Sequence, residues 1–205
     1  ACLVDIILAS GNPGKRREFE EIAALYGVAS VHLIAPDARA PHVAETGRNY
    51  LANARLKALA FTFQYNSPAL GDDSGLFVDA LGGAPGLRTA RFGGPGLSAE
   101  QRVELLLERL REVPPERRGA HFVCALYLAF PDGTRVTAHG FVYGRIAERQ
   151  AGSRGFGYDP IFLLPDLGCT LAELPPAEKH RRSHRGRAVR RLLRRLAYGP
   201  SAING

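Results

Sequence analysis

The spacing of apolar residues changes along the chain, and each spacing predicts a different kind of element. Short runs rich in Ile, Val and Leu at residues 3–9 and 30–35 predict buried strands. Stretches with an apolar residue every three or four positions predict amphipathic helices instead. The helices predicted in this way cover residues 19–26, 49–64, 98–112 and 184–196.

Residues at the ends of these helices agree with their predicted limits. Ser98 and Gln101 form a capping box, and Ser183 is a candidate N-cap for the last helix. Gly27 is expected to end the first helix, and Gly199–Pro200 to end the last one.

The helix predicted at 49–64 has an apolar stripe that we expect to face the core. Lys57 lies on another side of this helix, so we expect it off the core face. The stripe consists of Ala52, Leu56, Leu59, Ala60 and Phe63.

Two strand-like runs, residues 121–130 and 134–143, flank the turn sequence Pro131-Asp132-Gly133 and predict a hairpin. His121 and His139 lie inside these runs without a neighbouring metal ligand, so we interpret both as structural. The order of strands and helices predicts the α/β class, with a long mixed central sheet flanked by helices.

The stretch from Leu70 to Gly86 reads LGDDSGLFVDALGGAPG and carries the candidate chemistry. Asp72 and Asp73 follow an apolar run, and we expect them where a strand gives way to a glycine turn, on the rim of the sheet. Carboxylates there can hold a hard cation or accept a proton. A solvated turn is the alternative, because Asp, Ser and Gly are common turn residues. Asp79 lies deeper in the following run and is interpreted as structural.

The first strand leads into a glycine-rich loop at residues 10–15 and then into a helix. This order can present backbone N–H groups and the positive end of a helix to an anion. The loop is not a P-loop, because Ala9 replaces the first glycine of that motif and Arg16 its Ser or Thr. An ordinary strand-to-helix turn remains the alternative.

A second glycine-rich stretch, GSRGFGYDPIF at residues 152–162, alternates glycines with Phe156 and Tyr158. Glycines allow a loop to approach a ligand closely, and an exposed ring gives a flat base something to stack on. The alternative is a turn whose rings pack inward.

Charge and length narrow the class of protein. The 205 residues favour one domain, 1–205, and the net charge of +7 favours an anionic ligand or nucleic acid. The 27 basic residues include only three lysines, Lys15, Lys57 and Lys179, which are candidates for phosphate contacts. Eight arginines fall within residues 181–195, so binding of nucleic acid through this helix is an alternative function.

The cysteines and the apolar N-terminus bear on location. Cys2, Cys124 and Cys169 are far apart and odd in number, which favours a reducing compartment without a disulfide framework. The N-terminal run ACLVDIILAS lacks a basic segment before it and is interpreted as a strand rather than a secretion signal. We therefore expect a cytoplasmic protein without a membrane span.

Four of these stretches occur together in one order, and in that order the chain resembles the Ham1 family of inosine/xanthosine triphosphate pyrophosphatases over about residues 3–197. The four stretches are SGNPGK (10–15), GDDSGLFVDALGGAPG (71–86), GFGYDPIF (155–162) and SHRGRA (183–188).

The resemblance implies an enzyme that uses Mg²⁺ to hydrolyse non-canonical purine nucleoside triphosphates such as dITP, ITP and XTP to the monophosphate and pyrophosphate. It also implies two lobes with a nucleotide cleft between them, and a homodimer. Asp73 is implied as general base and metal ligand, with Glu45 as a second ligand and Asp72 as a further candidate. The implied substrate-binding residues are Ser10, Gly11, Asn12, Pro13, Gly14, Lys15, Lys57, Ser74, Phe156, Gly157, Tyr158, Asp159, Lys179, His184 and Arg185.

Two positions depart from the family pattern. Ala52 stands where the family has a glutamate before Asn53 and Ala54, which shifts expected metal binding to Glu45, Asp72 and Asp73. Arg88 stands where an aromatic residue is common. A pyrophosphatase with a different base preference, for example for modified pyrimidine nucleotides, remains an alternative.

Overall fold

The computed structural model describes the backbone of residues 4–26 and 31–198. Their contacts divide the chain into two compact units. Unit 1 contains the residues up to Asp73, Cys124–Gly140 and the residues from His184 onward, and unit 2 contains Ser74–Val123 and Phe141–Ser183. The single domain and the cleft between lobes stay predictions.

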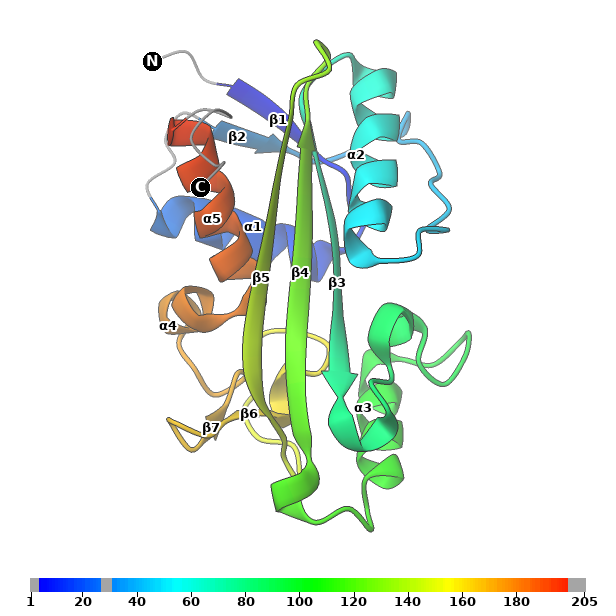
Figure 1. Cartoon of the computed structure of the whole chain (residues 1–205), viewed down its shortest axis with the longest axis vertical. Coiled ribbons are helices and arrows are strands. Elements are labelled where there is room, and N and C mark those ends of the chain that lie inside the picture. Colours follow the sequence, from blue (N-terminus) through cyan, green and yellow to red (C-terminus); the bar gives the residue numbers. More distant parts are fainter. Residues whose placement is uncertain (1–3, 27–30, 199–205) are drawn as a thin grey trace. The chain divides into compact units, whose positions relative to one another are not determined.

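The described chain has the α/β composition that the sequence predicts (Figure 1). Its strands are β1 (Val4–Leu8), β2 (Val31–Ile34), β3 (Ala69–Val78), β4 (Gly119–Ala129), β5 (Arg135–Ile146), β6 (Phe162–Leu164) and β7 (Cys169–Thr170). Its α-helices are α1 (Pro13–Leu25), α2 (Tyr50–Tyr65), α3 (Ala99–Arg109), α4 (Pro176–Arg182) and α5 (His184–Tyr198). Short 3₁₀ turns are η1 (Asp79–Leu81), η2 (Gly86–Arg91), η3 (Pro115–Arg117) and η4 (Asp159–Ile161).

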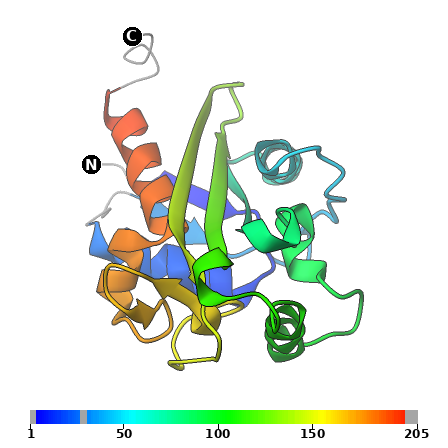
Figure 2. The ribbon, with the colours of Figure 1, turned by 60° about the horizontal axis from the view of Figure 1, so that its bottom comes forward.

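The seven strands form one mixed sheet in the order β2-β1-β3-β4-β5-β6-β7. β1 pairs in parallel with β2 and with β3, while β6 pairs antiparallel with β5 and with β7. The mixed sheet with flanking helices is therefore confirmed. The predicted hairpin is confirmed too: β4 and β5 run in opposite directions and meet at a turn in which the Gly133 N–H donates to the Phe130 carbonyl (Figure 2).

In unit 1, helices cover both faces of the strands. Alternate side chains of a strand point to opposite faces, and in β4 the side chains on both faces are apolar and pack against helices. Leu126 and Leu128 of β4 share a core cluster with Phe19 of α1 and Leu192 of α5. Tyr127, between those two leucines, packs with residues of α2 on the other face. Figure 1 shows α1 and α5 on one side of these strands and α2 on the other.

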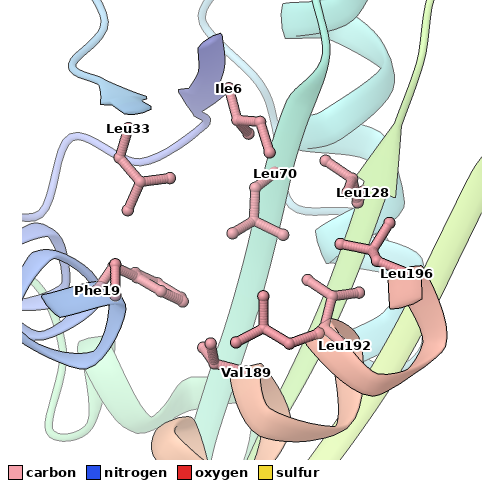
Figure 3. Close-up of a pocket in the computed structure, with 10 residues that line it drawn as sticks. Ile6, Phe19, Leu33, Leu70, Leu128, Val189, Leu192 and Leu196 are labelled. Atoms are coloured by element: carbon pink, nitrogen blue, oxygen red, sulfur yellow. The ribbon is translucent and has the colours of Figure 1, made fainter. Parts of the chain in front are cut away.

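A small apolar cavity of about 50 Å³ lies in unit 1 between helices α1 and α5 and strands β1 to β4 (Figure 3). Its lining includes no polar side chain, so it offers nothing to bind a phosphate or a cation. The lining residues are Ile6, Phe19, Ala23, Leu33, Leu70, Leu128, Val189, Leu192, Leu193 and Leu196.

The prediction for α2 was wrong about which side of the helix is buried. Phe63 is 90% exposed and Leu59 42% exposed, whereas Lys57 is only 9% exposed. The buried side carries Ala54 and Ala58 instead. The reason is close packing: a Cβ at Gly71 of β3 would collide with the Ala54 carbonyl, so only small α2 residues fit there.

The prediction that Asp72 and Asp73 end a strand was also wrong. Both lie inside the ten-residue strand β3, which continues to Val78 before the turn at η1. β1 pairs with β3 only as far as Leu70, so the two aspartates come just after the end of the neighbouring parallel strand. The sheet hydrogen bonds of β3 overcome the turn preference of Asp-Asp-Ser-Gly.

Unit 2 has its own core, to which α3 contributes Val103, Leu106 and Leu110. The predicted capping box is confirmed, since Ser98 and Gln101 bond reciprocally at the start of α3. Buried Arg118 donates to the carbonyls of Leu110, Val113 and Ala147 and thereby satisfies backbone groups after α3. The sequence did not predict α4 as a separate helix, and Ser183 lies between α4 and α5.

Gly27 and Gly199–Pro200, which were expected to end helices, lie outside the described residues, as does Cys2. Cys124 and Cys169 are both free thiols. Within residues 4–26 and 31–198, each helix is too short or too polar to span a bilayer.

Candidate active site

The glycine-rich loop at 10–15 places Lys15 in the first turn of α1. Asn12 caps this helix, since its side-chain oxygen accepts the Lys15 N–H at 3.1 Å, and Pro13 is the first helical residue. The expected strand–loop–helix order is confirmed, although the helix begins inside the predicted loop. The Lys15 ammonium lies 2.8 Å from Oδ2 of Asp72.

Asp72 is a fully buried carboxylate held among cations. Burial alone would raise its pKa, but Lys15, Lys57 and Arg185 outweigh burial and lower the pKa from 3.8 to about 2. Its contact with the Lys15 ammonium is a buried ion pair. At neutral pH Asp72 is therefore a negative charge that holds Lys15 in place.

The buried side of α2 brings Lys57 to Glu45, which lies in the loop before α2. The Lys57 ammonium donates to Oε1 of Glu45 at 2.8 Å. Burial lowers the pKa of Lys57, but the negative charges of Asp72, Glu45 and Asp73 raise it by more than burial lowers it. The net shift of the pKa is upward. Lys57 therefore stays a cation, and a positive charge is what a phosphate contact needs.

Asp73, the expected general base, is 8% exposed and accepts a hydrogen bond of 2.9 Å from the Asn53 amide. Burial raises its pKa and the nearby Glu45 adds to the rise, while Lys57, Asn53 and Lys15 oppose it; the net shift is upward. A carboxylate with a raised pKa is a stronger base, which suits proton abstraction from water.

The oxygen donors of unit 1 fit a magnesium ion. The described residues contain no group of three or more His, Cys, Asp or Glu side chains able to hold a metal alone. Mg²⁺ in nucleotide enzymes commonly uses one or two carboxylates together with substrate phosphates. Glu45 and Asp73 supply two such carboxylates, and α2 contacts both parts of the chain: Lys57 donates to Glu45, and Asn53 joins Asp73 to Gly47, two residues after Glu45. Asp72 fits less well, because it is fully buried against Lys15.

Sequence reasoning missed a buried ion pair between Glu18 of α1 and Arg185 of α5. The Arg185 guanidinium donates to Glu18 and lies 5.6 Å from the centre of the Phe19 ring. Burial lowers the pKa of Arg185, but Glu18, Cys124 and Asp72 raise it by more than burial lowers it. Arg185 therefore stays charged. Glu18 resembled any polar helix residue, and its partner is 167 positions away. His184, beside Arg185, is also buried.

In unit 2 the loop around Phe156 is organised by Asp159. One oxygen of Asp159 accepts from the Lys179 ammonium of α4 at 2.7 Å and from the Phe156 N–H at 2.9 Å. Gly155 has a φ of +76°, and a Cβ there would meet both Asp159 and Lys179. The Lys179 ammonium lies 5.8 Å from the centre of the Phe156 ring.

The two aromatic residues of this loop differ. Tyr158 packs in the unit 2 core, its hydroxyl donates to the Thr89 carbonyl at 3.1 Å, and burial raises its pKa to about 12. Phe156 is only half-buried. Gly157, which lies between Phe156 and Tyr158, is half-buried. Outside this loop, Ser74 of β3 is half-buried as well. The inward-packing alternative thus holds for Tyr158.

The predicted residues therefore gather in two sets. Unit 1 contains residues 10–15, Glu45, Lys57, Asp72, Asp73, His184 and Arg185, and unit 2 contains Ser74, Phe156–Asp159 and Lys179. The chain is thus an α/β protein with a cluster of carboxylates and lysines in unit 1 and a glycine-rich loop that carries a half-buried Phe156 in unit 2.

The comparison with known proteins identifies the family. The Ham1 family model matches residues 6–195, and the chain belongs to this family. Proteins named dITP/XTP pyrophosphatase are 47% identical to it in Yersinia pseudotuberculosis (92% of this chain, 95% of that protein) and Thermus thermophilus (95% and 93%).

Solved structures agree with the fold. A HAM1 protein from Coxiella burnetii superposes with a TM-score of 0.84 at 36% identity, covering 96% of this chain and all of that one. The Ham1 protein of Staphylococcus aureus gives 0.80 at 37% identity, covering 95% and 98%.

Proposed function

We propose that this protein hydrolyses the non-canonical purine nucleotides dITP, ITP and XTP to the nucleoside monophosphate and pyrophosphate, with Mg²⁺, and so cleanses the nucleotide pool. The observation that carries the proposal is Asp73: a largely buried carboxylate with a raised pKa, hydrogen-bonded by Asn53 and set beside Lys57 and Glu45. The names of the curated relatives support the same activity.

In this proposal unit 1 acts on the phosphates. Lys15, Lys57 and the N–H groups at the start of α1 bind the triphosphate. Glu45 and Asp73 hold Mg²⁺, which when bound neutralises negative charge on the phosphates. Asp73 accepts a proton from water as the water oxygen bonds to the α-phosphorus. The bond from that phosphorus to the bridging oxygen breaks, and pyrophosphate leaves with the electron pair.

The loop of unit 2 is proposed to bind the base. Phe156 stacks on the purine, while Asp159 and Lys179 fix the loop that carries the ring. A 6-oxo group accepts hydrogen bonds, so donors such as Arg185 or a backbone N–H favour inosine and xanthosine. They disfavour adenosine, whose 6-amino group would face another donor.

The test is Asp73→Asn. We expect release of pyrophosphate from dITP to fall by about 10²–10⁴-fold, since a general base is removed, while the circular dichroism spectrum stays that of the folded protein. Asp79→Asn, at an exposed position in η1, is the matched control and should keep wild-type turnover. Near wild-type turnover in folded Asp73→Asn would overturn the assignment of the base.

Another base preference is separated from this proposal by assaying pyrophosphate release from a panel of purine and pyrimidine triphosphates. If a modified pyrimidine triphosphate gave the highest kcat/KM, the proposed purine substrates would be wrong and the pyrimidine would be the substrate class instead. Nucleic-acid binding through α5 has less support, because Arg191 and Arg195 donate to the carbonyls of His139 and Thr137.

We also propose a cytoplasmic homodimer, as the family resemblance implies. The exposed apolar side chains Leu56, Leu59 and Phe63 on α2 are the kind of surface that a contact between protein chains buries. Sedimentation equilibrium of the wild type and Phe63→Ser tests both the dimer and this surface.

A further inference from the structure

We infer that Asn53 is a positioning residue for the reaction: its side-chain amide joins the Asp73 carboxylate to the loop that carries Glu45. The inference rests on the proposed function, because Asn53 can affect the reaction only if Asp73 is the general base. The three residues joined by these contacts, Gly47, Asn53 and Asp73, all belong to unit 1.

The bridge consists of two hydrogen bonds from one buried amide. Asn53 is 3% exposed, its Nδ2 donates to Oδ2 of Asp73 at 2.9 Å, and its Oδ1 accepts the Gly47 N–H at 2.7 Å. These two partners determine the orientation of the amide, because the backbone N–H can only donate and an ionised carboxylate can only accept. An amide is the side chain that offers one donor and one acceptor in this arrangement.

The helix that carries Asn53 is seated firmly on the strand that carries Asp73. The Ala54 carbonyl of α2 contacts β3 at Gly71, where no side chain fits between them. Asn53 precedes Ala54 on this helix, and Asp73 lies two positions along β3 from Gly71, so the short Asn53 side chain reaches Asp73 from a rigid support. This support lets the amide restrict rotation of the Asp73 carboxylate, where a longer side chain would hold it less tightly.

The loop before α2 is tethered to this helix at successive points. Tyr65 donates to Asp37 at 2.8 Å, Lys57 holds Glu45 at 2.8 Å, and Asn53 holds Gly47. Of these three side chains, Asn53 also donates a hydrogen bond to Asp73. Both proposed magnesium-binding carboxylates are therefore held from neighbouring turns of one helix, by Asn53 and Lys57.

Asn53→Asp separates the two arms of the bridge. The aspartate can still accept the Gly47 N–H, but once ionised it cannot donate to Asp73 and repels it. Assays are made at alkaline pH, where a proton shared between the two carboxylates is lost. The matched control is Asn49→Asp: Asn49 caps the same helix through the Ala52 N–H, and aspartate caps equally well.

We expect Asn53→Asp to lower kcat for dITP by about 100-fold with KM changed by less than about threefold, because a misplaced base weakens the chemical step more than binding. Asn49→Asp should stay within about twofold of wild type. The inference is overturned if Asn53→Asp matches Asn49→Asp in kcat, or if KM rises while kcat is unchanged. If the wild type itself releases no pyrophosphate from the panel, the proposed function fails.

A second readout needs neither substrate nor metal. Hydrogen exchange of the Gly47 amide in the metal-free protein should speed up by about tenfold or more in Asn53→Ala and stay slow in Asn53→Asp, which keeps the acceptor. Unchanged exchange in Asn53→Ala would contradict the bridge whatever the activity shows. Thermal unfolding of each variant separates these local effects from a general loss of stability.

Discussion

The two compact units differ in how they use charge. Unit 1 sets buried or half-buried carboxylates against cations in three pairs: Lys15 with Asp72, Lys57 with Glu45, and Arg185 with Glu18. In unit 2 the residues proposed for substrate binding depend on one buried pair, Lys179 with Asp159, which holds a half-buried ring. The difference matches the proposed roles, because phosphate chemistry needs opposed charges, whereas a base needs a flat apolar surface.

Glu18→Gln should give the largest effect on stability and would show how far unit 1 depends on its pairs. Removing one partner of a buried ion pair leaves an uncompensated charge, so we expect a loss of about 3–5 kcal/mol in the free energy of unfolding. Urea denaturation measures this change. A loss below 1 kcal/mol would mean that Arg185 is satisfied without Glu18.

Acid should destabilise unit 1 through Asp72. Its folded pKa of about 2 lies below the usual 3.8, so its contribution is present above pH 3.8 and is lost as the pH falls towards 2. The shift corresponds to about 2 kcal/mol. We expect the free energy of unfolding of Asp72→Asn to lack this part of the acid dependence.

Phe156→Ala tests the role of the ring in unit 2. Loss of base stacking costs about 1–3 kcal/mol, so the dissociation constant for inosine monophosphate should rise about 5- to 100-fold, as measured by calorimetry. Because the ring is assigned to binding, kcat at saturating dITP should change little. A large fall in kcat with an unchanged dissociation constant would contradict the proposal that unit 2 binds the base while unit 1 carries out the reaction.

Glu20→Gln should give the smallest effect and serves as the matched control for Glu18→Gln. Glu20 is on the same helix and pairs with Arg16 at 2.8 Å, but about half of each side chain is exposed. Exposed pairs at this spacing contribute about 0.3–0.5 kcal/mol. A larger loss in urea denaturation would imply that exposure is a poor guide to charge energetics in α1.

Local patterns were sufficient where the neighbours in space are also neighbours in sequence. The capping box at Ser98 and Gln101 and the turn at Pro131–Gly133 are short-range features, and the structure confirms both. The order of motifs was likewise enough to reach the Ham1 family, which the family model confirms. From sequence, Asp73, Glu45 and the three lysines were already the candidates for the chemistry.

Only the tertiary structure decided which side of α2 is buried and which side chains join the candidate site. The leucines of α2 predicted the wrong face, because close contact at Gly71 admits alanines and leaves Leu59 and Phe63 outside. The contacts of Asn53 with Asp73 and of Glu18 with Arg185 gave no local signal, because these pairs are 20 and 167 positions apart. Sequence patterns record which residues can be buried; the pairing of buried charges depends on which distant segments the fold brings together.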